Sequence, residues 1–200
     1  RSTLFPYTTL FRSRSIASPV VDNIAPSEVH NLLGQKISED PEPLYDFDFY
    51  RFNQSADLEW QNYHQHNADA TNPFNTLVIG QGYLYATKED RTLVFSGEYP
   101  SGIGPVEVPL DYVEGKPLAG WNLVGNPFAQ TAYVDGRPFY VMNEGGSEII
   151  PSDRDNVEPM EGIFVKAEEN GDTVTFTQNT RSKGHIQKPE PEQIVINLST

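Results

Sequence analysis

The chain has 200 residues and a net charge of −14 at pH 7, because 28 acidic side chains outnumber 14 basic ones. Such a surface repels phosphate backbones and anionic lipids, so we expect no nucleic-acid partner. No apolar run approaches the roughly 20 residues that cross a bilayer, so we expect no membrane insertion. The chain has no cysteine, which excludes disulfides, thiolate catalysis and cysteine-ligated zinc.

The first thirteen residues do not read as part of a fold. Residues 1–13 run RSTLFPYTTLFRS and resemble the conceptual translation of a common short-read sequencing adapter. They do not read as a signal peptide, because Pro6 interrupts the apolar residues and Arg12 stands where a cleavage site needs small residues. We therefore expect residues 1–13 to be an artefact and a β domain to span residues 14–180.

Residues 14–99 form the first half of the predicted domain. Pro26–Gly34 predicts a short helix, because a proline and Ser27 begin it and Gly34 can end it. The polar stretch Gln61–Asn72 predicts a long loop. Four strand-like blocks frame these segments: Ile16–Val20, Phe49–Asn53, Gly82–Ala86 and Thr92–Phe95.

Residues 118–180 form the second half, after a Gly/Pro-rich connection over Pro100–Pro117. Apolar and hydroxyl residues alternate over Thr173–Thr177, which is typical of a half-buried strand. Asn170-Gly171 favours a hairpin turn before it. Four blocks recur in the order found in the first half: Val124–Phe128, Phe139–Asn143, Gly162–Ala167 and Thr173–Phe176.

The shared order of the blocks indicates an internal duplication. Each half reads as a small antiparallel meander, so we predict a mainly β, antiparallel domain with a two-fold repeat and one short helix. Its two meanders would pack as a sandwich-like or barrel-like domain.

The end of the chain, residues 181–200, reads as a linker and a single strand. Gln187–Gln193 is a Pro/Glu spacer that favours an extended chain. The strand-like run Ile194–Leu198 follows it. Because a lone strand after a spacer has nothing local to pair with, we interpret it as the first strand of a missing downstream domain.

The second half also carries a family resemblance. Gly120–Phe128 (GWNLVGNPF), Phe139–Asn143 (FYVMN) and Pro159–Val165 (PMEGIFV) resemble a β-rich module of large secreted and surface proteins from Bacteroidota. In the first half, Ile16–Val20 and Gly80–Ala86 match the same module. Such modules usually lie between upstream repeat or immunoglobulin-like domains and a sorting signal of the type IX secretion system. The resemblance implies export, an extracellular or cell-surface location and covalently linked neighbouring domains, and it carries over no catalytic residue.

One histidine pair has metal-like spacing. His64 and His66 would share a face if they lay on a strand, with Asp69 as a third ligand. The alternative reading is a solvated polar loop. A calcium site is also weighed against a solvated acidic loop, and the loop is favoured because the frame of a calcium loop is absent. The acidic residues considered for calcium are Asp46, Asp48, Asp153 and Asp155.

Aromatic residues offer a second candidate site. Trp60 and Tyr63 lie in the polar insertion and present flat apolar faces that suit a sugar ring. Tyr83 and Tyr85 align with aliphatic residues of the second half and therefore read as core. Trp121, beside a strand start, is also predicted to be core.

The sequence contains neither a Gly-x-Ser-x-Gly elbow nor a His-Glu-x-x-His motif. We therefore predict a protein that is not an enzyme and needs no cofactor, a structural or adhesion-associated module of an exported surface protein. The alternative is a carbohydrate-binding module that uses Trp60 and Tyr63, with an extracellular glycan or protein as partner. A third reading is a hydrolase whose active site lies on other domains.

Overall fold

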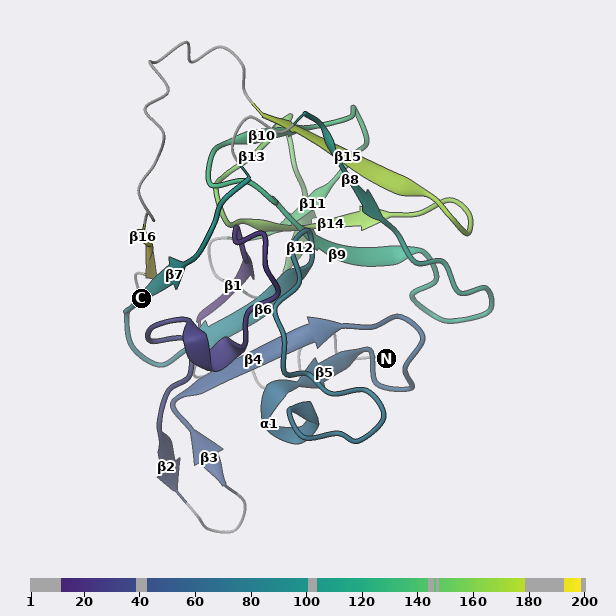
Figure 1. Cartoon of the computed structure of the whole chain (residues 1–200). Coiled ribbons are helices and arrows are strands. Elements are labelled where there is room, and N and C mark those ends of the chain that lie inside the picture. Colours follow the sequence, from purple (N-terminus) through teal and green to yellow (C-terminus); the bar gives the residue numbers. More distant parts are fainter. Residues whose placement is uncertain are drawn as a thin grey trace, which may run out of the picture.

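Antiparallel strands form nearly all of the regular structure, as the sequence predicts. The computed structural model describes residues 12–38, 43–100, 104–143, 146, 148–178 and 193–198. Within these residues the strands form three four-stranded sheets and two strand pairs (Figure 1). The predicted mainly β fold class is confirmed. No helix in the described ranges has the length and apolarity needed to cross a bilayer.

Two of the sheets have matching strand orders. The first sheet has the order β1 (Arg12–Ala17), β6 (Gly82–Thr87), β4 (Phe47–Phe52) and β5 (Trp60–Asn62). The second sheet has the order β9 (Trp121–Gly125), β14 (Gly162–Lys166), β11 (Tyr140–Met142) and β12 (Ile149–Pro151).

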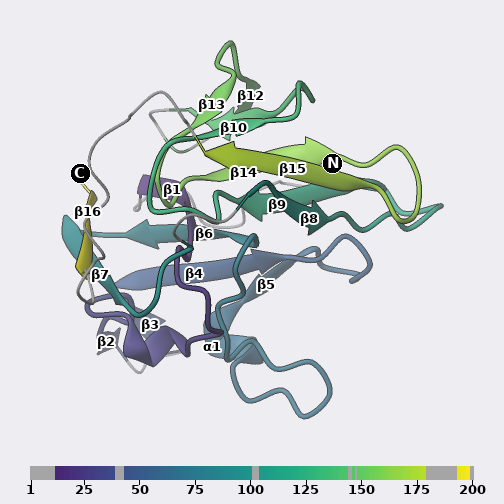
Figure 2. The ribbon, with the colours of Figure 1, turned by 45° about the horizontal axis from the view of Figure 1, so that its top comes forward.

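The remaining strands lie outside these two sheets. The outer sheet has the order β13 (Asn156–Val157), β10 (Ala132–Val134), β15 (Thr173–Gln178) and β8 (Val106–Pro109). The two strand pairs are β7 (Arg91–Ser96) with β16 (Gln193–Leu198), and β2 (Lys36–Ser38) with β3 (Leu44–Tyr45). In Figure 1 the outer, second and first sheets follow one another from top to bottom, and in Figure 2 the outer and second sheets overlap above the first.

The strand registers confirm the internal repeat. The first and second sheets pair corresponding residues of the predicted blocks, so that Ala17 faces Gly82 and Gly125 faces Gly162. The match extends to the next strand of each sheet, where Tyr50 pairs with Leu84 and Tyr140 pairs with Phe164. Phe49 and Phe139, one residue earlier, therefore occupy equivalent positions.

The two halves contact each other through reciprocal backbone hydrogen bonds. Ala17 N–H donates to the Met160 carbonyl at 2.8 Å, and Gly125 N–H donates to the Gly80 carbonyl at 2.9 Å. Gly80 and Met160 are themselves equivalent, and both have positive φ, 80° and 59°. An approximate two-fold rotation therefore relates the halves and the backbone atoms that join them.

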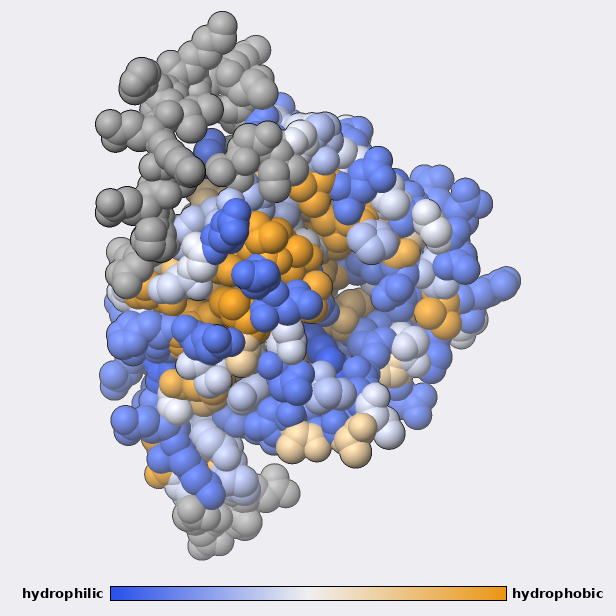
Figure 3. All heavy atoms as spheres, in the orientation of Figure 1, coloured by the Kyte–Doolittle hydropathy of each residue, from blue (hydrophilic) through white to orange (hydrophobic). Residues whose placement is uncertain are grey.

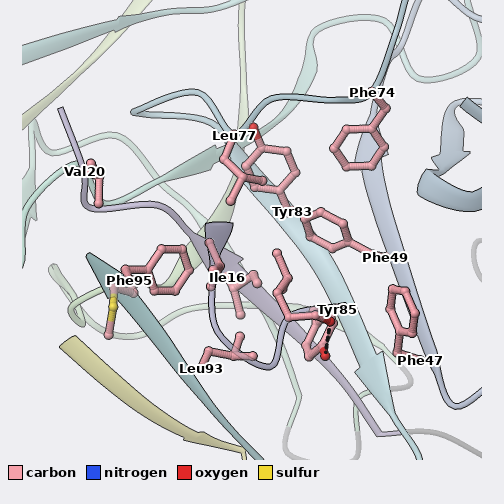
Figure 4. Close-up of a cluster of buried hydrophobic side chains, with 13 residues drawn as sticks. Ile16, Val20, Phe47, Phe49, Phe74, Leu77, Tyr83, Tyr85, Leu93 and Phe95 are labelled. Atoms are coloured by element: carbon pink, nitrogen blue, oxygen red, sulfur yellow. Dashed lines mark hydrogen bonds between the residues drawn. The ribbon is translucent and has the colours of Figure 1, made fainter. Parts of the chain in front are cut away.

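Each half has its own hydrophobic core. The first core is rich in aromatic rings and lies between the first sheet and the segments around β7 (Figure 4). The second core is mostly aliphatic and lies between the second sheet and the outer sheet. Tyr83 and Tyr85 are almost fully buried in the first core, as predicted. Hydrophilic residues cover most of the face in Figure 3, with an apolar patch near its centre.

The predicted helix is shorter than expected. Only Pro26–Glu28 is helical, as a 3₁₀ turn, and Val29 already has extended dihedrals. His30 then exchanges two backbone hydrogen bonds with Val94 of β7. The segment leaves the helix because its backbone pairs with a strand, although Val29 and Leu32 are buried as an apolar helix face would be.

The predicted long loop, Gln61–Asn72, contains regular structure. Its first residues complete β5, and α1 follows over Tyr63–His66. Asn62 caps this helix, because its side-chain oxygen accepts the N–H of His64 at 2.8 Å. The predicted connection over residues 100–117 likewise contains strand β8.

The chain ends also differ from the sequence reading. Residues 1–11 lie outside the described part, but Arg12 and Ser13 belong to β1 and pair with Thr87 and Ala86. The last strand, which has nothing local to pair with, pairs as β16 with the distant strand β7. The foreign origin of the first residues and the existence of a downstream domain stay predictions.

Candidate functional site

A small hollow opens between the two halves, where β5 and β12 lie at corresponding sheet edges. Its volume is about 310 Å³. Its walls are almost entirely apolar, and we call it the aromatic hollow. It is lined by Phe52, Trp60, Leu118, Trp121, Tyr140, Ile149 and Phe164.

The two halves place side chains of different size at equivalent positions of the hollow. Trp60 pairs with Phe52 across β5 and β4, and Ile149 pairs with Met142 across β12 and β11. Trp60 and Ile149 are therefore equivalent, and the indole provides the larger wall. The Trp60 ring packs edge to face on Phe52 at 5.2 Å between centroids and on Phe164 at 6.0 Å. Phe164, on β14, carries the contact from one half to the other.

Trp121 and Tyr140 of the second half also line the aromatic hollow. Their rings lie edge to face with centroids 5.0 Å apart. The Lys166 ammonium lies 6.0 Å from the centroid of the Trp121 ring. Contrary to the sequence reading, Trp121 is only half-buried, because it is the first residue of β9 and projects where the sheets part.

A larger hollow is lined in part by the same two rings. Its volume is about 940 Å³, and we call it the polar hollow. Trp121 and Tyr140 line both hollows, so the two hollows adjoin at these rings. The other lining residues include charged side chains of both signs: Asp135, Arg137, Lys166 and Glu168.

A buried glutamine holds the start of β9 in place. Gln54 is 2% exposed and follows β4 of the first half. Its amide nitrogen donates to the carbonyls of Asp111 and Trp121 at 2.6 and 3.1 Å. Its oxygen accepts the N–H groups of Val113 and Gly120 at 3.0 and 2.8 Å. Because all four capacities of the side chain are used, the backbone of Trp121 is fixed relative to the first half.

An ion pair stiffens the rim of the polar hollow. The Arg137 guanidinium donates to both carboxylate oxygens of Asp172 at 2.8 Å. These hydrogen bonds lower the pKa of Asp172 to about 2 and raise the pKa of Arg137. Arg137 also donates to the Lys166 and Thr173 carbonyls, so the pair ties the hairpin after β14 to the segment before β11.

The two predicted ligand-binding aromatics point to different places. Trp60 lines the aromatic hollow, whereas Tyr63 on α1 packs on Phe49 and Phe74 with centroids 6.1 and 5.6 Å apart. Tyr63 thus extends the first core and does not form a platform with Trp60. Sequence reasoning did not identify Trp121 and Tyr140 as residues of the hollow. Each of them is the first residue of a strand of the second sheet, β9 and β11, and this placement was the signal that could have identified them.

The structure brings only two of the three predicted metal ligands close together, with His66 Nδ1 3.6 Å from Asp69 Oδ2. His64 and His66 lie on a helix, where residues two apart face different directions. The His64 ring stacks on Tyr45 at 3.6 Å, and burial lowers its pKa. Asp69 accepts three hydrogen bonds from Thr71 and Asn72, which hold its pKa at about 2. Among the described residues no group of three potential ligands surrounds one point.

The acidic residues considered for calcium also have other roles. Asp46 forms an ion pair with Arg91 and accepts the N–H of Gln35. Asp48 accepts the side-chain amide of Asn62 at 3.1 Å, and burial raises its pKa. Asp46 therefore joins the residue before β4 to β7, and Asp48, within β4, holds the end of β5.

Comparison of the chain with protein-family models, with curated proteins and with solved structures finds no match.

Proposed function

We propose that the chain is a non-catalytic structural module of an exported bacterial surface protein. The observation that carries this proposal is the reciprocal backbone pairing of the halves through Ala17, Gly80, Gly125 and Met160. A covalent duplication joined in this way gives one stacked body instead of two hinged ones. Such a body suits a spacer that holds neighbouring domains apart. The export part of the proposal rests on the resemblance to Bacteroidota surface modules.

Unfolding measurements test the structural part. Each half contains one tryptophan, so Trp60→Phe and Trp121→Phe leave a single indole that reports on the second and the first half, respectively. We expect both variants to unfold in one transition with the same midpoint, and the calorimetric enthalpy to equal the van't Hoff enthalpy. Two separated transitions would show that the halves are independent domains and would contradict the spacer role.

A second candidate function is carbohydrate binding at the aromatic hollow. The observation that favours it is the joining of Trp60, Trp121 and Tyr140 beside a depression rimmed by charged groups. Indole and phenol rings offer apolar faces to the C–H surface of a sugar, and the adjacent polar groups can bind its hydroxyls. This placement replaces Tyr63 of the sequence reading with residues of the second half.

A glycan array followed by titration tests this candidate. We expect any glycan that binds the wild type to lose affinity by on the order of tenfold or more in Trp121→Ala, since removing one stacking ring costs over 1 kcal/mol. Trp121→Phe retains a ring face and should bind with intermediate affinity. Tyr63→Phe is the control, because Tyr63 lies in the first core. Binding to no glycan, or equal binding by Trp121→Ala, would remove this function.

A further inference from the structure

The last strand after each half pairs with the other half. β8 follows β7 of the first half in the chain but pairs with β15 of the second. β16 follows β15 of the second half but pairs with β7 of the first (Figure 1). The halves have therefore exchanged their final strands.

The two exchanged strands occupy equivalent register positions. Phe95 on β7 and Phe176 on β15 are equivalent residues of the repeat, and so are Leu93 and Val174. The pairings of these four residues are Phe95 with Ile194, Phe176 with Val106, Leu93 with Ile196, and Val174 with Val108. β16 therefore stands to β7 as β8 stands to β15.

The second half shows what this position requires of a strand. On β8, Val108 is buried, whereas Glu107 is exposed, and Leu110 directly after the strand is buried again. The position thus requires apolar residues at alternate places and accepts a charge between them. The segment Ile194-Val195-Ile196-Asn197-Leu198 has aliphatic residues at the matching places.

The edge of β7 that β16 covers needs a partner. Val94 exchanges both of its backbone hydrogen bonds with His30. Because backbone groups alternate in direction along a strand, the N–H and C=O groups of Leu93 and Phe95 face the opposite edge, where β16 pairs. Leu93 and Phe95 are fully buried residues of the first core. The Phe95 carbonyl also accepts the Tyr99 hydroxyl at 2.8 Å, but an open edge would expose the remaining polar groups beside apolar ones.

We propose that this edge of β7 is a strand-acceptor site. Its ligand is an extended peptide with branched aliphatic residues at alternate positions. Gln193–Leu198 of the same chain fills it within one molecule, and the same segment of a second copy fills it when that strand is withdrawn. The exchange of final strands between the two halves of one chain is the intramolecular form of this binding.

A peptide-binding experiment on the full chain tests the proposal. Ile194→Asp combined with Ile196→Asp removes the apolar residues of β16 and opens the acceptor. A fluorescent synthetic peptide of residues 187–200 should bind this double variant on the order of tenfold or more tighter than the wild type, in which the tethered strand competes. Val195→Glu is the matched control, because Glu107 is the natural residue at the equivalent position, and it should bind as weakly as the wild type. A folded double variant that does not bind the peptide overturns the proposal.

A disulfide experiment does not depend on that variant folding. The chain has no cysteine, so Val94→Cys with Val195→Cys introduces one pair at facing register positions. Oxidation of dilute protein should give an intramolecular disulfide. Refolding at high concentration before oxidation should give disulfide-linked dimers through exchange. Failure to form either species would contradict the pairing, and monomers alone at every concentration would contradict acceptance of a second copy's strand.

Discussion

The two halves of the molecule share their backbone architecture and differ in what fills it. Both have the same strand order, the same register and the same contacts across the two-fold relation. The first core, however, stacks aromatic rings such as Phe74 on Tyr83, whereas the second is built mainly from Val, Ile and Ala. Backbone contacts are retained where no side chain can substitute for them, and core side chains vary as long as volume is filled.

The cover over each core differs as well. The second core is closed by the four-stranded outer sheet, whereas the first is closed by β7 and by irregular segments. Arg51 fixes one of these segments, because its guanidinium donates to the carbonyls of Asn72 and Pro73 and lies over the Phe74 ring. The first half thus replaces a sheet with insertions that individual side chains hold in place.

The largest expected effect comes from a substitution that disrupts the backbone contact between the two halves. A methyl group added at Gly125 would collide with Ala17 and lie 2.7 Å from the Gln81 carbonyl oxygen. Backbone atoms cannot move aside cheaply, so we expect Gly125→Ala to lower the free energy of unfolding by about 3 kcal/mol. Urea denaturation measures this loss. Gly104→Ala, where nothing lies within 4 Å, is the control and should leave stability almost unchanged.

The second prediction concerns Gln54, whose hydrogen bonds join the halves outside both cores. Gln54→Ala leaves the N–H groups of Val113 and Gly120 and two carbonyls without their partner. We expect a loss of about 2 kcal/mol in the free energy of unfolding and a red shift of Trp121 fluorescence. Gln61→Ala is the matched control, because Gln61 accepts a hydrogen bond from Arg51 within the first half. Equal losses in both variants would show that Gln54 has no special role in joining the halves.

The sequence could predict the features that depend on local pattern. The four repeated blocks contain the glycines and core residues that set the register, so their common order revealed the duplication. Trp121 was misread as core because its exposure arises where two sheet edges meet, which no local pattern records. The correspondence between β8 and β16 was missed because the Gly/Pro-rich stretch around β8 read as a connection, whereas the Pro/Glu spacer made β16 read as the start of another domain. The helix over residues 26–34 was overestimated because a backbone pairing with β7 overrode its caps.

The third prediction compares equivalent residues that differ in chemistry. Asn126 and Ser18 both accept a backbone N–H two residues ahead, from Phe128 at 2.9 Å and from Val20 at 3.4 Å. Asn126 also donates to the carbonyls of Gln130, Val157 and Glu158. We expect Asn126→Ser to cost about 1.5 kcal/mol of unfolding free energy and Ser18→Ala about 0.5 kcal/mol. Thermal unfolding ranks the two, and the reverse order would refute the idea that Asn126 anchors its half more firmly.

The smallest expected effect is a pH response confined to the first half, since the described residues of the second half include no counterpart of α1 and its histidine. Burial against Tyr45 and Phe47 lowers the pKa of His64 from its ordinary value of 6.5, and Asp48 opposes this only partly. As pH falls through 6.5, the unfolded chain therefore takes up a proton that the folded chain resists, and stability decreases.

Denaturation between pH 7.5 and 5.5 should show this decrease in the wild type and a flatter profile in His64→Phe, where the apolar ring retains the stacking. His66→Gln removes an imidazole that faces Asp69 instead of the aromatic rings and should keep the wild-type slope. If His64→Phe kept that slope as well, the acid sensitivity would have to arise from groups common to both halves, and the difference between their covers would have no consequence for pH.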